Sequence, residues 1–547
     1  MTLTVNLLRK WKSARGLALL ALLLAPGLLA ARKFYPDDPL QAVPPPRPVQ
    51  TALNRQLSEY FDFFHNTFVQ PGERHSKTKV IPAQEVNTLG EVPDGAWYTN
   101  RHYQRRMSIA ELVRGPGNEN APATDGPLKV IAAKTEGVTP GFTIEDARGR
   151  RFVVKFDPLT NPEMASAADV ISSKFFYALG YYVPENYILY FQKQRLTVSP
   201  NATITDADGK HRKMTAGDIE EILLRVPRDP AKGYRAGASL YISGKILGPF
   251  RYWGTRADDP NDVVPHEHRR DLRGLFVFSA WLGHNDVKSL NTLDSLVVEN
   301  GIRHIRHYLI DFGATLGSDS FTAKSPRAGN EYLFAWKPAA AQFFSLGLYP
   351  PGWSKARYPH LPAAGNFESE IFEPERWKSN YPTAAFDNRL PEDVFWAAKQ
   401  VMAFSDDEIR AIVRTGQYSN PETERWISDC LIARRDKIGK AFLPKVLPLD
   451  RFAVYDGRLV FEDLGGTHKL AAARNYVIQW SRFDNEAERK APLDGETSFA
   501  LPRSFENAAG GEYFAADIHA GDPKMMVTVY LRKQPGQAEV VGIDRSW

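Results

Sequence analysis

The sequence predicts an α+β protein, with strands in the first part of the folded region, helices in the middle and strands again near the C-terminus. Three observations predict this class. Short apolar runs separated by turn residues occupy residues 128–156, and helices are expected at 409–415 and 422–442. After Pro448, short strand-like segments return, for example at residues 513–519. The 547 residues are 43% hydrophobic and 24% charged, which is the composition of a globular chain with several domains.

The N-terminal residues have the pattern of an export signal. Arg9, Lys10, Lys12 and Arg15 precede the uncharged, apolar stretch 16–31. As a helix this stretch would be roughly 24 Å long, which is less than the ~30 Å thickness of the hydrocarbon core of a bilayer. The stretch is therefore either a cleaved signal peptide or an uncleaved membrane anchor, and both alternatives remain. Either one places the remainder of the chain outside the cytoplasm, in the periplasm or at the cell envelope.

The rest of the chain divides into a linker, two central regions and a C-terminal module. The proline-rich stretch 43–48 predicts a stiff, extended linker. Residues 201–232 are predicted to be an inserted loop with a short helix. The expected regions are a signal peptide or anchor (1–31), a linker and N-terminal extension (32–127), a strand-rich region (128–250), a helical region (251–447) and a C-terminal β module (448–547).

A strand followed by a helix stands near the start of the first central region. The strand is Arg151–Phe156, and the helix is expected to begin near Asn161 and to end at Gly180. In the second central region a helix at 268–282 leads through a polar turn into a hairpin at 293–310. The polar turn between this helix and the hairpin holds most of the candidate functional residues.

Charge, cysteine content and motifs exclude several classes of function. Lys and Arg number 69 against 64 for Asp and Glu, and four of the positive charges lie in the N-terminal segment. The remainder is close to neutral and lacks the basic surface that nucleic-acid binding needs, so no nucleic-acid partner is expected. The single Cys430 excludes an internal disulfide and a cysteine-rich zinc module. A hydrolase has little support, because the sequence contains neither G-x-S-x-G nor H-E-x-x-H.

The polar turn carries an ordered set of residues suited to phosphoryl transfer. Residues 284–291 read His-Asn-Asp-Val-Lys-Ser-Leu-Asn, and Asp-Phe-Gly follows at 311–313. Phosphoryl transfer needs a carboxylate that orients the nucleophile, ligands for Mg²⁺ and a cation on the phosphates. The first segment matches the kinase catalytic loop H-R-D-x-K-x-x-N at its His, Asp, Lys and Asn, and D-F-G follows after a strand as in kinases.

On these motifs the chain resembles the protein-kinase-like superfamily over about residues 128–445, and in particular atypical bacterial members such as HipA-type kinases and exported spore-coat kinases. The resemblance implies a bilobal fold with a β-rich N-lobe and a helical C-lobe. It also implies roles for four residues. Asp286 would orient the acceptor hydroxyl, Lys288 would steady the transferring phosphate, and Asn291 and Asp311 would hold Mg²⁺ or Mn²⁺.

The same resemblance implies how ATP would be held. Lys155 would reach the α- and β-phosphates, with Asp169 or Glu163 as its acidic partner on the following helix. In place of a G-x-G-x-x-G loop the chain has Gly137 and Gly141, which would let the backbone approach the phosphates. The A-P-E segment of eukaryotic kinases is missing after D-F-G, so a peptide-binding groove of that type is not expected.

The function expected from the sequence is therefore that of an exported, atypical kinase. It would transfer the γ-phosphate of ATP to an unknown acceptor, which is a protein, a glycan or a small molecule. Two alternatives stay open: a catalytically inactive, kinase-like scaffold of the cell envelope, and an AMP transferase on the same fold. Contact with a membrane is expected only through an uncleaved N-terminal segment.

Overall fold

The structure is a computed structural model, and part of the chain lies outside the residues that it describes. The predicted signal or anchor (1–31) and Gly137 fall in that part. Among the described residues, no helix has the length and apolar character needed to cross a bilayer. The described residues are 32–117, 119–133, 140–205, 211–345, 348, 350–472 and 474–547.

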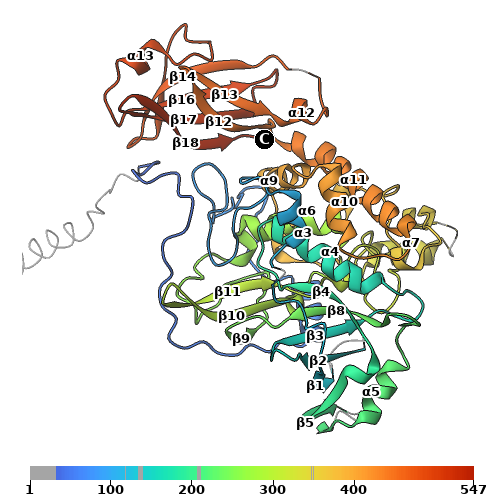
Figure 1. Cartoon of the computed structure of the whole chain (residues 1–547). Coiled ribbons are helices and arrows are strands. Elements are labelled where there is room, and N and C mark those ends of the chain that lie inside the picture. Colours follow the sequence, from blue (N-terminus) through green and yellow to red (C-terminus); the bar gives the residue numbers. More distant parts are fainter. Residues whose placement is uncertain are drawn as a thin grey trace, which may run out of the picture.

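The predicted α+β class is confirmed, and Figure 1 shows a large sheet, a helical region and a second sheet in succession. In the large sheet the strands follow the order β4-β8-β3-β2-β1-β5-β6, with β7 paired to β8. Strand β5 runs parallel to β1, and the other pairings are antiparallel. The strands are β1 (Leu128–Ala133), β2 (Gly141–Glu145), β3 (Arg151–Phe156), β4 (Asn186–Phe191), β5 (Leu196–Thr205), β6 (His211–Lys213), β7 (Arg228–Asp229) and β8 (Gly233–Leu240).

Strands β1, β2 and β3 have the bounds that the sequence predicts. Gly141 pairs with Lys155 in the β2–β3 register, and the two strands approach closely at this point. A Cβ added to Gly141 would lie 2.2 Å from the carbonyl oxygen of Val154, so the pairing requires glycine here. The insertion at 201–232 contains more strand than expected, because β5 extends into it and β6 and β7 follow.

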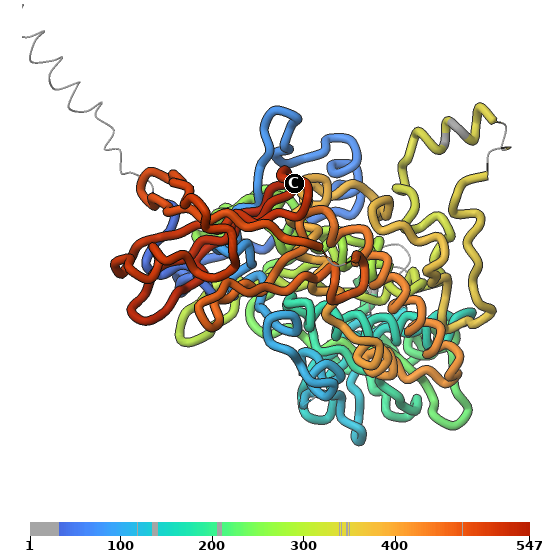
Figure 2. Tube along the Cα trace, turned by 90° about the horizontal axis from the view of Figure 1, so that it is seen from above, coloured from blue at the N-terminus to red at the C-terminus, as the bar shows by residue number. Residues whose placement is uncertain are grey.

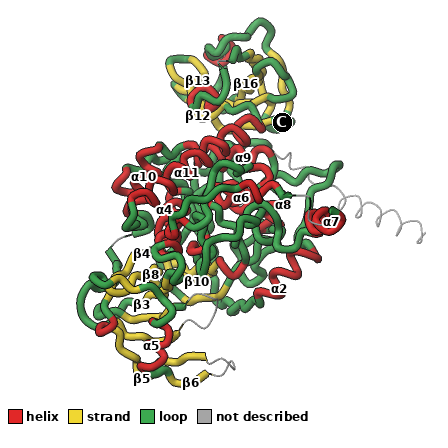
Figure 3. Tube along the Cα trace, turned by 90° about the vertical axis from the view of Figure 1, so that its right-hand side faces the viewer, coloured by secondary structure: helices red, strands yellow, loops and turns green. Residues whose placement is uncertain are grey.

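The helices gather mainly between the two sheets, as the colours of Figure 3 show. The helix after β3 starts later than expected, at Met164, because Glu163 adopts a left-handed conformation with φ 68°. The helices are α2 (Glu59–Phe64), α3 (Ile109–Arg114), α4 (Met164–Ala178), α5 (Ala216–Leu223), α6 (Arg270–Leu282), α7 (Trp336–Phe344), α8 (Ala384–Asp387), α9 (Pro391–Met402), α10 (Asp406–Arg414), α11 (Pro421–Phe442), α12 (Leu464–Thr467) and α13 (Arg503–Glu506).

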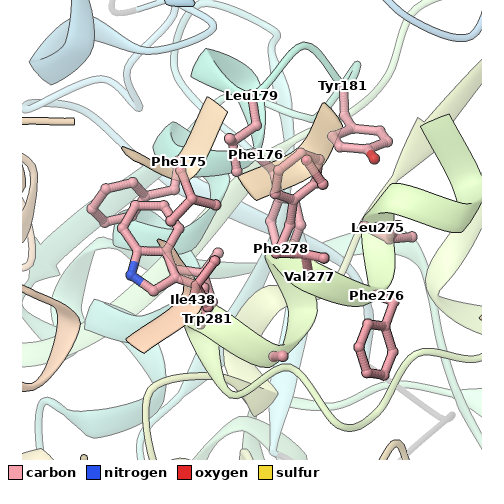
Figure 4. Packing of buried hydrophobic residues seen from close by; sticks show 14 of the residues in the cluster. Phe175, Phe176, Leu179, Tyr181, Leu275, Phe276, Val277, Phe278, Trp281 and Ile438 are labelled. Atoms are coloured by element: carbon pink, nitrogen blue, oxygen red, sulfur yellow. The ribbon is translucent and has the colours of Figure 1, made fainter. Parts of the chain in front are cut away.

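The main hydrophobic core joins α4 to α6 and α11. Figure 4 shows aromatic side chains of α4 and α6 packed against each other, with Ile438 of α11 beside them. The rings of Phe175 and Trp281 meet edge to face with centroids 4.9 Å apart, and both side chains are fully buried. This core holds α4 behind the large sheet and α6 at the start of residues 284–291, so it fixes the two elements that flank the site.

A three-stranded sheet leads into the site from the other direction. Strands β9 (Lys245–Gly248), β10 (Thr292–Glu299) and β11 (Ile302–Leu309) pair in the order β11-β10-β9. The backbone N–H of Ile310, just after β11, donates to the carbonyl oxygen of Asn291, at 3.0 Å. The segment that contains Asp311 therefore runs beside the end of the 284–291 loop.

The C-terminal residues form a five-stranded antiparallel sheet with a hydrophobic core of its own. Figure 2 shows the first described residues beside this sheet. Phe34 is 1% exposed and packs on it, and the side chain of Arg532 donates to the carbonyls of Tyr35 and Asp38. The strands are β12 (Leu449–Tyr455), β13 (Arg458–Asp463), β14 (Val477–Asp484), β15 (Arg489–Pro492), β16 (Tyr513–His519), β17 (Met526–Gln534) and β18 (Gln537–Arg545), of which β12 and β13 form a separate hairpin.

The predicted linker lies along the molecule and bonds to several distant segments. The N–H of Val43 donates to the carbonyl of Asp94, and that of Val49 to the carbonyl of Arg303, each at 2.8 Å. The chain then reaches α2 and the adjoining π-helix (His65–Val69). This path carries the N-terminal extension from the C-terminal sheet to the 284–291 loop.

Candidate active site

Lys155 and Asp311 meet although 156 positions separate them. The ammonium of Lys155, on β3, lies 2.5 Å from Oδ1 of Asp311, which follows β11. Asp311 has a left-handed backbone conformation, with φ 63° and ψ 67°. This conformation is sparsely populated for a residue other than glycine and is enriched at functional positions.

Asp169 completes a charged cluster around Lys155. Its side chain projects from α4 and is almost fully buried. Oδ1 of Asp169 accepts the backbone N–H of Phe312 at 2.9 Å, so α4 holds the 311–313 segment directly. Lys155, Asp169 and Gly313 line one small pocket.

The charges in this cluster shift one another's pKa values. Burial opposes the charge on Lys155, but the carboxylates of Asp311 and Asp169 outweigh it and raise the pKa of the lysine. Burial raises the pKa of Asp169, and the neighbouring Asp311 adds to this effect against the attraction of Lys155. A further cation at this position would relieve the repulsion between the two carboxylates.

Glu163, the second candidate partner of Lys155, lies elsewhere. Its carboxylate accepts the backbone N–H of Ser419 at 2.8 Å and the hydroxyl of the same residue at 3.0 Å. The left-handed backbone at Glu163 places it outside α4, whereas Asp169 lies within the helix. Of the two alternatives, the structure brings Asp169 to Lys155.

The residues of the 284–291 loop form a second cluster around Asp286. The carboxamide of Asn291 donates to Oδ2 of Asp286 at 3.0 Å, and the ammonium of Lys288 lies 3.3 Å from the same oxygen. The carboxamide of Asn380 donates to Oδ1 at 3.1 Å. Asp286 is close enough to Lys155 to contribute to the raised pKa of that lysine. The backbone hydrogen bond from Ile310 to Asn291 brings the segment of Asp311 beside the loop, so the two clusters adjoin, and the site that they form together is named the cleft.

His284 supports the loop from the core side. Its ring is buried and meets the ring of Phe312 at an edge, with centroids 6.1 Å apart. Burial lowers the pKa of His284 to about 4, and the charge of Lys324 acts in the same direction. A neutral, packed histidine between the loop and the D-F-G segment has a structural role.

Sequence reasoning missed four residues that contact the loop: Glu59, Asp62, Lys324 and Asn380. The ammonium of Lys324 donates to the carbonyls of Gly283 and Ala314 and to the side chain of Asn285. Burial lowers its pKa to about 8. No sequence motif marks these residues, because each belongs to a segment far from the loop along the chain.

A larger cavity, of about 700 Å³, lies beside the loop. Its lining includes Asn285, Lys324, Trp353 and Arg434. Among the described residues that line it, none belongs to the two carboxylate clusters.

The donor set of the cleft fits a hard divalent cation. Asp311 supplies a carboxylate, and Asn291 supplies a carboxamide whose nitrogen is engaged with Asp286. Oxygen donors of these two kinds suit Mg²⁺ or Mn²⁺. Among the described residues, no group of three or more His, Cys, Asp or Glu side chains is placed to hold a metal ion.

Comparisons with known proteins find solved kinase structures of low similarity. No family model matches the chain, and no curated protein matches it. The proinflammatory kinase CtkA of Helicobacter pylori has 11% identity and a TM-score of 0.30, over 57% of this chain and 94% of that chain. The Golgi casein kinase with Mn and ADP bound has 8% identity and a TM-score of 0.26, over 60% of this chain and 75% of that chain. A second structure of the Golgi casein kinase has 9% identity and a TM-score of 0.28, over 75% of this chain and 98% of that chain.

Proposed function

We propose that this chain is a phosphotransferase that uses ATP and Mg²⁺ or Mn²⁺. We propose further that its fold is bilobal and protein-kinase-like, with the site between the two lobes. One observation carries the proposal: Lys155, Asp169 and Asp311 meet in one cluster, and the bond from Ile310 to Asn291 sets that cluster beside the loop that holds Asp286. The motif order around these residues supports the atypical bacterial branch that resembles HipA-type and exported spore-coat kinases.

The resemblance to kinases implies a role for each residue of the cleft. Lys155 would bind the nucleotide phosphates, and Asp311 and Asn291 would hold a metal ion, which would supply charge neutralisation on the phosphates. Asp286 accepts a hydrogen bond from the acceptor hydroxyl and so aligns it. Lys288, beside Asp286, stabilises negative charge on the transferring group. Little general-base work is required, because the transition state of phosphoryl transfer is loose.

The acceptor is a protein, a glycan or a small molecule that presents a hydroxyl to Asp286. The N-terminal signal pattern supports a location outside the cytoplasm, in the periplasm or at the cell envelope. Gly141 lies beside Lys155 in the β2–β3 register, a position that would let the backbone approach the phosphates.

Nucleotide binding and turnover by the full chain test this proposal. Millimolar ATP with Mg²⁺ or Mn²⁺ should raise the melting temperature, because a ligand that binds the folded state stabilises it. Asp311→Asn should remove the metal-dependent part of that shift, and Asp311→Asn and Asp286→Asn should each lower turnover by at least about 10²-fold. The matched control is Asp429→Asn on α11, an exposed aspartate paired with Arg410, which should leave turnover unchanged.

The mass of the modified acceptor distinguishes the possible reactions. Phosphate transfer adds about 80 Da and AMP transfer adds about 329 Da. Absence of both a thermal shift and turnover in the wild-type chain would favour an inactive scaffold and refute the proposal. Turnover that survives both substitutions would refute the assigned roles.

A further inference from the structure

Helix α2 of the N-terminal extension lies against the 284–291 loop. Two of its acidic residues reach the loop: the carboxylate of Glu59 lies 2.6 Å from the ammonium of Lys288, and Asp62 bonds to Ser289. Glu59 is exposed, whereas Asp62 is 4% exposed. The Glu59 contact is therefore an exposed ion pair, whereas the Asp62 contact buries a carboxylate, and the groups that stabilise this buried charge have to be identified.

Asp62 is a buried carboxylate held entirely by neutral donors. Its Oδ2 accepts the backbone N–H of Ser289 at 3.1 Å and the hydroxyl of Tyr381 at 2.8 Å. Its Oδ1 accepts the hydroxyl of Ser289 and the carboxamide of Asn66, each at 3.0 Å. No ion pair joins Asp62 to a cation among the described residues. Burying a charge is costly unless hydrogen bonds satisfy it, and four donors converge here to do so.

Two of the four donors belong to Ser289, which stands between the residues assigned to chemistry. Ser289 follows Lys288 and begins the 3₁₀ turn Ser289–Asn291. In that turn the N–H of Asn291 donates to the carbonyl of Lys288 at 3.0 Å. A clamp on both the backbone and the side chain of Ser289 therefore fixes the positions of Lys288 and Asn291 on either side.

We propose that Asp62 is a positioning residue for phosphoryl transfer, which sets the geometry of the 284–291 loop from the N-terminal extension. The inference rests on the proposed function. It makes α2 part of the site, although 227 positions separate Asp62 from Ser289. Tyr381 links α2 to the loop as well. Its ring meets that of Phe63 edge to face, and its neighbour Asn380 donates a hydrogen bond to Asp286.

The test combines steady-state kinetics with hydrogen exchange on the full chain. Asp62→Ala should lower kcat by about 10²-fold, because a small misplacement of reacting groups has an effect of this size. The KM for ATP should stay within about threefold, because Lys155 on the phosphates and the charged metal ligand Asp311 are untouched, and Asn291 supplies only a neutral ligand. Asp62→Asn keeps the volume of the side chain and one acceptor oxygen, so its kcat should fall between those of Asp62→Ala and the wild type.

Hydrogen exchange reports the clamp without any need for activity. The amide of Ser289 should exchange at least about tenfold faster in Asp62→Ala, while the strands β16 and β17 exchange as in the wild type. The matched control is Tyr60→Ala, a residue of the same helix that is 78% exposed, which should change neither kcat nor exchange. If Asp62→Ala unfolds the chain, Tyr381→Phe removes a single donor to Asp62 and should lower kcat two- to tenfold at unchanged KM.

The outcomes separate the two proposals. An inactive wild-type chain refutes the proposed phosphotransferase function. In that case the rate of hydrogen exchange at the Ser289 amide alone decides whether Asp62 holds the loop. An active wild type with unchanged kcat in Asp62→Ala, or with unchanged exchange at Ser289, overturns the role of Asp62. A fall in kcat/KM caused wholly by a higher KM for ATP would also overturn it, since it would place the effect on nucleotide binding.

Discussion

Two buried aspartates hold the two segments of the cleft, and they do so by different means. Asp169 accepts the N–H of Phe312 beside the proposed metal ligand, and Asp62 accepts the N–H of Ser289 in the middle of the loop. Their side chains are 3% and 4% exposed. Asp169 shares its surroundings with the cation of Lys155, whereas Asp62 is satisfied by hydroxyl, amide and carboxamide donors.

The difference shows how function divides between the two sides of the cleft. On the Asp169 side the charges belong to the group that would bind nucleotide and metal, so binding can exchange one partner for another. On the Asp62 side every donor is a fixed part of the chain, so the carboxylate maintains geometry and does not take part in binding. Substitutions on the first side should therefore affect binding and turnover, and those on the second side should affect turnover alone.

The largest expected effect follows from Lys155→Met, which leaves two carboxylates in the cleft without their shared cation. Turnover should fall by about 10³-fold, because the phosphates lose a direct charge contact in a partly desolvated site. Steady-state phosphotransfer measures it. Lys129→Met, on β1 of the same sheet and paired with Glu145 at 3.4 Å, is the matched control and should turn over normally. A loss of less than tenfold in Lys155→Met would remove Lys155 from the nucleotide site.

Asp169→Asn should have the next largest effect, a fall of about 10²-fold in kcat/KM for ATP. The amide keeps an acceptor for the N–H of Phe312 but removes a charge that orients Lys155. Isothermal titration with nucleotide and kinetics together measure binding and turnover. Asp146→Asn provides the control, since this aspartate is also buried but pairs with Arg150 in the β2–β3 turn. Normal ATP affinity in Asp169→Asn would contradict the division between the two sides.

Lys324 connects the two sides, and its pKa of about 8 predicts a pH-dependent stability. In the unfolded chain the lysine keeps its proton up to about pH 10.5, so the unfolded state binds more protons between pH 8 and 10.5. The free energy of unfolding attributable to Lys324 should therefore rise with pH across this window, by at most about 1.4 kcal/mol per pH unit. Below pH 8 the cost of burying the charge is fully present.

Chemical denaturation of the wild type and Lys324→Met at pH 7.5 and 9.5 measures this contribution. The stability of the wild type relative to the variant should increase by about 2 kcal/mol between the two pH values. A difference that does not change with pH would mean that Lys324 keeps an ordinary pKa in the folded chain.

The smallest effect is expected from Glu59→Gln on the same helix as Asp62. The Glu59–Lys288 pair is largely exposed on the Glu59 side and contributes little to stability. The KM for ATP should change by less than about threefold, and hydrogen exchange at Ser289 should match the wild type. A loss of kcat as large as that of Asp62→Ala would show that charge on α2, and not the buried clamp, controls the loop.

Local patterns in the sequence were sufficient for the strands that carry Gly141 and Lys155. The alternation of apolar residues and the turn before Arg151 predicted β1, β2 and β3 with the bounds that the structure has. The spacing of Asp286, Lys288 and Asn291, and the D-F-G that follows, likewise depends on a short stretch of chain. Helix starts were less well predicted, because the left-handed conformation of Glu163 has no local sequence signal.

What the sequence alone determined is strands β1 to β3, the hairpin of β10 and β11, helices α6 and α11 to within about two residues, and the local motif residues. These features follow from hydrophobic period, turn chemistry and loop spacing, which act over a few neighbouring residues. The tertiary structure decided which distant groups complete the cleft: Asp169 in place of Glu163, Lys324 behind the loop, and Asp62 over a separation of 227 positions. A buried N–H accepts any carboxylate that packing brings within reach, and packing depends on the whole fold.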